Sequence, residues 1–278
     1  MINVNGELVQ DENGLSANNR AFLLGDGVFE TLKIVNGQIL YFEDHYFRLM
    51  SGMRIVRMEI PMNFTMEFLE KQILDTAKAN NCEKSCRVRF TVFRNAGGFY
   101  LPSTNTISYL ITTVVTDKSY INDHKECEVD LYKDFYVTRQ LLSTVKTTNR
   151  LLNITASIYA DENGLQNCLL INDAKNVIEA INGNLFMRIG AKISTPPLEE
   201  GCIKGILRMQ ALTLLKGMEN YQVVEEPISP FDLQKADELF FTNVIQGVQS
   251  ITKYRKRNYS FEVADELVSK LNDLMPKD

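Results

Sequence analysis

The alternation of apolar and polar residues predicts that the chain begins as a sheet. Residues 2–9 are predicted to form two short strands around Asn5-Gly6, a dipeptide that favours the tight turn of a hairpin. A strand is predicted over residues 28–35, and Asn36-Gly37 closes a second hairpin onto residues 38–42. We therefore expect two hairpins before the first long helix.

The apolar period then changes to that of helices. A helix is predicted from Glu43 and ends before Pro61, and residues 65–79 have the spacing of a second helix. Strands are predicted at residues 85–93, where valine and phenylalanine alternate with arginine and threonine, and at residues 106–115.

The polar segment 116–126 is the best candidate for a linker in this chain. It separates a smaller N-terminal α/β domain, residues 1–115, from a larger C-terminal domain, residues 127–278. The predicted strands of the larger domain lie at 127–137 and 238–243, with two short apolar strands that carry Glu179 and Asn184-Leu-Phe186. Its predicted helices lie at 149–160, 206–216 and 260–274. Strands and helices mix without a regular βαβ alternation, so we expect an α+β (mixed α/β) fold in two domains.

Composition narrows the function classes. A net charge of −5 does not favour a nucleic-acid partner, and no apolar run has the length of a membrane span. No secretory signal is visible at the N-terminus, so we expect the reducing cytoplasm. Five cysteines argue against a disulfide framework, and because no histidine lies near Cys82 and Cys86, we expect no metal site.

Two residues combine into a candidate for chemistry. Lys146 follows a Ser-Thr turn, and Glu179 lies inside the apolar pattern of residues 177–181. Glutamate is rarely buried without a partner, so the two suggest a charge network built for a purpose. The alternative is a solvated loop lysine and an acid on an exposed strand edge, and these residues alone favour that alternative.

Three other positions could bind phosphate. Gly205 opens a predicted helix, whose free N–H groups and dipole attract anions. Arg48 could add a cation, and Thr242-Asn243 at a strand end could add a hydroxyl and an amide. Each of these, taken singly, is also compatible with a cap or a surface group.

Set in order, these pieces resemble the class IV aminotransferase family, the pyridoxal-phosphate enzymes of fold type IV. That family includes branched-chain and D-amino-acid aminotransferases and 4-amino-4-deoxychorismate lyase. The resemblance extends from Gly6 to about Ile251. The matching motifs are Gly25-Asp-Gly-Val-Phe-Glu30, His45-x-x-Arg48-Leu, Lys146-x-x-Asn149, Glu179-x4-Asn184-Leu-Phe, Thr195-Pro196, Gly205-Ile-x-Arg208 and Ala236-Asp-Glu-Leu-Phe240.

The resemblance implies roles for these residues. Lys146, assigned to the larger domain, would hold pyridoxal 5'-phosphate as a Schiff base and later move the α-proton. Glu179 would pair with the pyridine nitrogen, and Asn184 would support the strand behind the ring. The implied phosphate ligands are Arg48, the backbone of Gly205, Ile206 and Leu207, and Thr242 with Asn243. A small-molecule amino substrate and a homodimer are also implied.

The resemblance also bears on the reaction. Branched-chain enzymes usually carry a tyrosine five residues after the lysine, where this chain has Leu151. The lyases carry a threonine that assists proton transfer, which corresponds to Thr31, and Phe29, Lys33 and Arg94 are implied substrate contacts. The lyase is therefore our first hypothesis, and an amino-acid transaminase of the branched-chain or D-amino-acid type is the second. A non-enzymatic scaffold has no reason to keep both the lysine and the acid.

Overall fold

The computed structural model describes residues 1–10 and 15–277. Its contacts divide the chain into two compact units. The first unit contains Met1–Ser119, Val145–Asn149 and Met275–Asp278, and the second contains Tyr120–Thr144 and Arg150–Leu274. The predicted linker is thus divided at Ser119, and the segment of Lys146 belongs to the first unit rather than to the larger one. Within the described ranges, no helix is long and apolar enough to cross a membrane.

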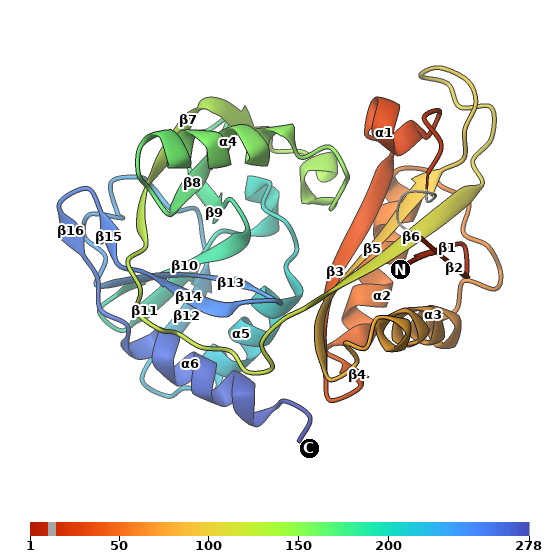
Figure 1. Ribbon diagram of the computed structural model, residues 1–278. Helices are drawn as coiled ribbons and strands as arrows, with labels where there is room; N and C mark the ends of the chain where they lie inside the picture. Colours follow the sequence, from red (N-terminus) through yellow and green to blue (C-terminus); the bar gives the residue numbers. More distant parts are fainter. Residues whose placement is uncertain (11–14, 278) are drawn as a thin grey trace. The chain divides into compact units, whose positions relative to one another are not determined.

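The first unit is built on an antiparallel sheet (Figure 1). Its strand order is β2-β1-β6-β5-β3-β4. The bounds are β1 Ile2–Val4, β2 Glu7–Val9, β3 Gly27–Val35, β4 Gln38–Ile39, β5 Ser85–Arg94 and β6 Ile107–Val115. A short helix, α1, spans Arg20–Leu24 and precedes β3.

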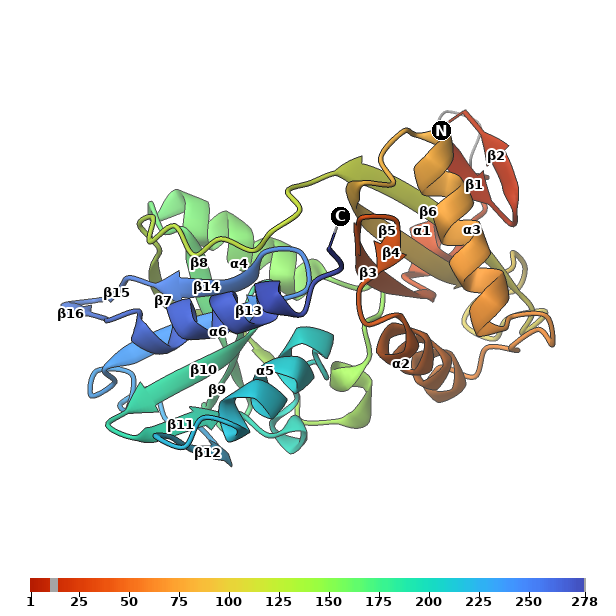
Figure 2. The ribbon, with the colours of Figure 1, turned by 90° about the horizontal axis from the view of Figure 1, so that it is seen from below.

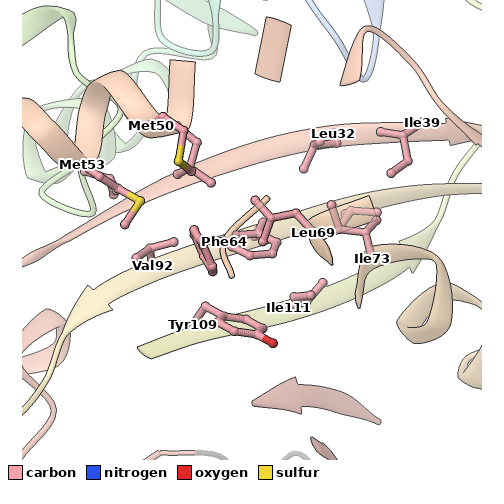
Figure 3. Packing of buried hydrophobic residues seen from close by; sticks show 14 of the residues in the cluster. Leu32, Ile39, Met50, Met53, Phe64, Leu69, Ile73, Val92, Tyr109 and Ile111 are labelled. Atoms are coloured by element: carbon pink, nitrogen blue, oxygen red, sulfur yellow. The ribbon is translucent and has the colours of Figure 1, made fainter. Parts of the chain in front are cut away.

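Two helices, α2 (Phe42–Ile55) and α3 (Met66–Ala79), cover one face of this sheet (Figure 2). Their apolar residues form one core with the inward side chains of the strands. Figure 3 shows Met50 and Met53 of α2 packed with Leu32 of β3 and Val92 of β5. Burying such side chains stabilises a fold by roughly 1.5–3 kcal/mol each.

Both predicted hairpins are confirmed, but the second is shorter than expected. Asn36 and Gly37 adopt φ angles of 50° and 75°, as a tight hairpin turn requires. The strand after this turn ends at Ile39, so its predicted extension to residue 42 is wrong. Tyr41 has a φ of 53°, which breaks the extended backbone, and α2 starts at the next residue.

The second unit contains a larger mixed sheet. Its main path runs β12-β11-β10-β9-β8-β7-β15-β16, and β13 joins β10 to β14. The bounds are β7 Glu128–Val137, β8 Asn167–Asn172, β9 Val177–Ala180, β10 Gly183–Ile189, β11 Lys192–Thr195, β12 Gln222–Glu225, β13 Glu238–Asn243, β14 Gly247–Ile251, β15 Lys253–Tyr254 and β16 Arg257–Asn258. The mixed α/β class is therefore confirmed.

Three longer helices belong to this unit: α4 (Leu151–Glu162), α5 (Ile206–Lys216) and α6 (Glu262–Asp273). The 3₁₀ turns η2 (Leu141–Thr144) and η3 (Leu198–Glu200) complete it. The prediction for α5 is confirmed at both ends. Helix α4 starts two residues later than predicted, because Asn149 still belongs to the segment that pairs with the first unit.

Candidate functional site

The segment of Lys146 is fixed to β3 by backbone hydrogen bonds. Phe29 N donates to Lys146 O at 2.8 Å, and Thr148 N donates to Gly27 O at 2.8 Å. The Thr148 hydroxyl also donates to Gly25 O at 2.8 Å. A Cβ at Gly27 would lie only 3.0 Å from Thr148 Cγ2, so the glycine permits this close approach.

The Lys146 side chain lies over an aromatic ring. Its Nζ is 4.6 Å from the centroid of the buried Phe29 ring. The guanidinium carbon of Arg89, on β5, is 3.7 Å from the same centroid. A cation over the face of an aromatic ring interacts favourably with it. The Phe29 ring therefore brings the side chains of Lys146 and Arg89 close to the same point on the sheet.

Phe29 belongs to a row of alternating residues on β3. Val28, Leu32 and Ile34 are in the apolar core with α2 and α3, so Phe29, Thr31 and Lys33 project from the opposite face. Thr31 is partly buried and lies directly opposite Arg89. The structure therefore brings three predicted residues to the face that also carries the Lys146 contact.

Lys33 is a buried lysine, 1% exposed. Burial lowers its pKa to about 8, although the charge of Asp117 acts in the opposite direction. The amine is therefore largely charged at pH 7 and loses its charge as the pH rises through about 8.

Arg48 is held by Glu30, the last residue of the motif that starts at Gly25. The Glu30 carboxylate accepts hydrogen bonds from Arg48 Nε at 2.7 Å and Nη2 at 2.5 Å. Its Oε2 also lies 2.7 Å from His45 Nδ1. Burial alone would raise the pKa of Glu30, but Arg48 and His45 outweigh it and lower the pKa to about 2. The carboxylate is thus an ionised anchor for Arg48.

Arg94 has a different environment from the other predicted substrate contacts. It lies on the same face of β5 as Val92 and is 6% exposed. Its guanidinium donates to Asp26 at 3.0 Å, to Val56 O at 2.7 Å and to Asn105 Oδ1. Because Arg94 ends β5 and Asn105 lies just before β6, the bond to Asn105 joins the two ends of the loop over residues 95–106.

In the second unit, three predicted residues form one row across the sheet. Glu179 of β9 lies opposite Asn184 of β10, and Asn184 lies opposite Thr242 of β13. Residues that face each other in antiparallel pairs project from the same side. Glu179 Oε2 accepts from Ile203 N at 3.1 Å, while Asn184 Nδ2 donates to Ile203 O at 2.8 Å. The row therefore faces the chain that leads into α5.

The start of α5 has the features of an anion site. Gly205 is its N-terminal cap and, as a glycine, has no side chain that could accept a hydrogen bond from the first turn of the helix. A Cβ at Gly205 would lie 1.9 Å from Asn184 Oδ1, so any other residue here would have to displace the Asn184 side chain or the helix. The buried Thr242 Oγ1 has no hydrogen-bond partner within residues 1–10 and 15–277. Free helix N–H groups and an unpaired hydroxyl are what a phosphate accepts.

Ile206, Leu207 and Asn243 complete the predicted set. Ile206 and Leu207 occupy the first turn of α5, and their side chains are buried. Asn243 Oδ1 accepts from Ile245 N at 3.1 Å and Gln246 N at 2.9 Å. The asparagine thus shapes the turn that follows Thr242.

A model of the class IV amino-transferase family matches residues 27–254. The chain belongs to this family. A candidate branched-chain-amino-acid aminotransferase of Methanocaldococcus jannaschii is 26% identical over 98% of this chain and 94% of its own length. An aminodeoxychorismate lyase of Vibrio harveyi is 25% identical over 84% of each chain.

The fold is that of solved members of the family. The branched-chain amino acid aminotransferase of Escherichia coli superposes with a TM-score of 0.87 at 18% identity, covering 98% of this chain and 93% of its own. The protein is a pyridoxal-phosphate-dependent enzyme. The cofactor fits the chain, because a helix that opens with glycine and a Thr242 hydroxyl that has no partner within residues 1–10 and 15–277 both suit its phosphate.

Glu30 and His45 both lie in the matching motifs, but the motifs assigned neither of them a role in holding Arg48. Glu30 lies in register with Val28 and Leu32, which are core residues, so an acid there needs a partner. This is the same signal that singled out Glu179. Arg89 gave no signal, since arginine on the polar face of a strand is ordinary.

Proposed function

We propose that this enzyme is a 4-amino-4-deoxychorismate lyase, which releases pyruvate and 4-aminobenzoate. The observation that carries the proposal is the position of Thr31. Its hydroxyl projects from the same face of β3 as Phe29, over whose ring the Lys146 amine stands. A hydroxyl there can pass a proton to the part of the substrate that leaves as pyruvate.

In this proposal the chain binds the cofactor through separate groups. Lys146 forms the covalent link and, once released, moves the α-proton of the substrate. Glu179 pairs with the pyridine nitrogen, and Asn184 supports the strand that carries this acid. The phosphate ligands are Arg48, the N–H groups of Gly205, Ile206 and Leu207, and the side chains of Thr242 and Asn243. When bound, pyridoxal 5'-phosphate withdraws electrons from the substrate's α-carbon.

The substrate contacts in the proposal are Phe29 and Lys33. Phe29 offers an apolar ring for a cyclic substrate, and Lys33 offers a cation for a carboxylate. Arg94, first expected to touch the substrate, has a second candidate role. Its bond to Asn105 Oδ1, together with its bond to Asp26, makes it an anchor for the far end of the loop over residues 95–106.

The second candidate is an amino-acid transaminase. It is favoured by the similarity to the Methanocaldococcus jannaschii protein, which extends over 98% of this chain. A transaminase would need the same lysine, acid and phosphate ligands. The two candidates therefore differ in what Thr31 and the substrate contacts do, not in how the cofactor is held.

The experiment begins with the absorbance spectrum of the purified enzyme. We expect a yellow protein whose cofactor band is lost in Lys146→Ala. Incubation with aminodeoxychorismate should then release pyruvate. Transfer of amino groups from glutamate to a 2-oxo acid, without pyruvate from aminodeoxychorismate, would instead establish the transaminase. A colourless protein that takes up no added cofactor would overturn both.

We also propose that the enzyme forms a homodimer. Bulky apolar side chains are exposed on the first unit at Phe22 (78%), Phe99 (90%), Tyr100 (93%) and Leu101 (85%). Arg20 ties α1 to this loop, since its Nη1 donates to Phe99 O at 2.7 Å. Exposed patches of this kind mark interaction surfaces. Sedimentation equilibrium should give twice the chain mass, and Tyr100→Ser should shift the equilibrium toward the single chain.

A further inference from the structure

The second unit begins with a buried tyrosine that contacts the turn after Thr242. Tyr120 is 2% exposed, and its hydroxyl donates to Val244 O at 2.8 Å. Val244 lies between β13 and β14, in the turn that Asn243 shapes. The tyrosine thus bonds to the backbone of a turn that is far away along the chain.

The ring of Tyr120 also packs against the far end of this turn. Gly247 has a φ of 79°, and a Cβ at this position would lie 2.4 Å from Tyr120 Cγ. Only glycine leaves room for the ring here. Tyr120 therefore contacts the turn at two points: it donates a hydrogen bond to Val244 O, and its ring packs against Gly247.

The tyrosine is itself fixed by α6. Tyr120 N donates to Asn272 Oδ1 at 2.9 Å, and Asn272 Nδ2 donates back to Tyr120 O at 2.9 Å. Two residues on, Asn122 Nδ2 donates to Ser250 Oγ of β14 at 2.9 Å. These bonds attach residues 120–122 to α6 and β14, so Tyr120 can in turn hold the turn after Thr242 in place.

We propose that Tyr120 is a positioning residue that holds the turn over residues 243–247 in the shape that presents Thr242 and Asn243 to the cofactor phosphate. The inference rests on the phosphate roles proposed above. Without the tyrosine hydroxyl, Val244 O loses a donor in a buried setting, and the turn can relax. Precise placement matters because hydrogen bonds weaken steeply away from good geometry.

A second tyrosine gives a matched control. Tyr259 is 6% exposed, and its hydroxyl donates to a backbone carbonyl, Leu233 O, at 2.7 Å. Tyr259→Phe and Tyr120→Phe therefore remove the same kind of bond from the same unit. A loss of stability alone should appear in both variants, whereas a positioning effect should appear in Tyr120→Phe only.

The test titrates full-length apoenzyme with pyridoxal 5'-phosphate and, separately, with pyridoxal, which lacks the phosphate. We expect Tyr120→Phe to weaken pyridoxal 5'-phosphate about tenfold and pyridoxal less than about twofold, as loss of aligned hydrogen bonds predicts. Tyr259→Phe should change neither by more than about twofold. Amide hydrogen exchange over residues 243–247 should be faster in Tyr120→Phe than in Tyr259→Phe.

Each other outcome has a clear meaning. If wild type prefers pyridoxal 5'-phosphate to pyridoxal and Tyr120→Phe keeps that preference, the inference is overturned while the proposed function stands. If wild type shows no such preference, the phosphate roles fail, and the inference fails with them. Gly247→Ala, which pushes on the same ring, must also lower the preference, and serves as the deciding variant if Tyr120→Phe does not fold.

Discussion

Glu30 and Arg48 form a forked ion pair, with the carboxylate accepting from Nε at 2.7 Å and from Nη2 at 2.5 Å. The acid is buried on β3 and the arginine extends from α2. Two parallel hydrogen bonds fix the plane of a guanidinium as well as its position. The ion pair therefore determines the direction in which the Arg48 guanidinium can donate to an anion. This makes Glu30 the first residue to test.

Glu30→Gln should weaken the binding of pyridoxal 5'-phosphate by about tenfold, because an amide cannot accept a charge-assisted fork from Arg48. Titration of the apoenzyme measures the effect. Glu200→Gln is a suitable control, since Glu200 is also a buried acid but accepts from the amides of Asn172 and Asn176. Equal affinity in the two variants would show that Glu30 does not orient Arg48.

The same carboxylate should make stability depend on pH in acid. The pKa of Glu30 is about 2 in the folded chain and 4.5 as its ordinary value. Because folding lowers this pKa, the stabilisation is present above 4.5 and is lost as the pH falls toward 2. The loss attributable to Glu30 is about 3 kcal/mol at most. Urea unfolding at stepped pH should show a shallower acid decline in Glu30→Gln, and parallel declines would contradict the assignment.

Thr242→Val should separate stability from cofactor binding. The Thr242 hydroxyl is buried without a partner among the described residues, so its removal should stabilise the apoenzyme by about 1 kcal/mol. The same change should weaken the binding of pyridoxal 5'-phosphate, because it removes a proposed phosphate ligand. Thermal unfolding and titration measure the two effects.

Thr195→Val supplies the contrast for this experiment. The Thr195 hydroxyl donates to Leu185 O at 2.7 Å, and the residue is fully buried. This variant should lose about 1–2 kcal/mol of stability and keep its cofactor affinity. A lower melting temperature for apo Thr242→Val would mean that its hydroxyl has an unrecognised role in the folded chain.

Gly205→Ala should damage the start of α5. The added Cβ would lie 1.9 Å from Asn184 Oδ1, so the asparagine or the helix must move. We expect a loss of about 1–3 kcal/mol and a marked fall in cofactor affinity. Gly217→Ala, at the other end of the helix, meets its nearest atom at 3.3 Å and is the control. Comparable cofactor affinities in the two variants would argue against a phosphate site at Gly205.

Lys33 should cause kcat/KM to decrease at alkaline pH. Its pKa of about 8 means that it loses its charge within the working range of most assays. We expect kcat/KM to fall above pH 8, since this ratio follows the free enzyme's ionisations. Lys33→Arg should extend the plateau to higher pH because arginine stays protonated. An unchanged profile in Lys33→Arg would exclude Lys33 as the titrating group.

Local patterns in the sequence predicted most of the elements. Helix α5 has its predicted bounds, because its apolar period and the opening glycine are properties of the segment itself. Glu179 stood out because its neighbours are apolar, and in the structure it meets the Ile203 N–H. Such signals need no knowledge of distant partners.

Patterns in the sequence did not reveal which distant strands pair with each other. The alignment of Glu179, Asn184 and Thr242 depends on β13 pairing with β10, which a pattern along one strand does not reveal. The attachment of Lys146 to Phe29 likewise depends on a bond between residues far apart in the chain. Residue types alone suggested candidate roles for these residues. Which of the residues lie next to one another became clear only from the fold.

The return of Val145–Asn149 to the first unit has a consequence for biosynthesis. All strands of the first sheet leave the ribosome before this segment does. The N–H of Phe29, on β3, donates to Lys146 O, so this hydrogen bond cannot form until the segment has been made. A nascent chain that ends at Ser119 therefore has an unfinished edge at β3, exposed to wrong partners. The same segment completes that edge and carries Lys146, so the nascent first unit gains this lysine only when the edge of β3 is completed.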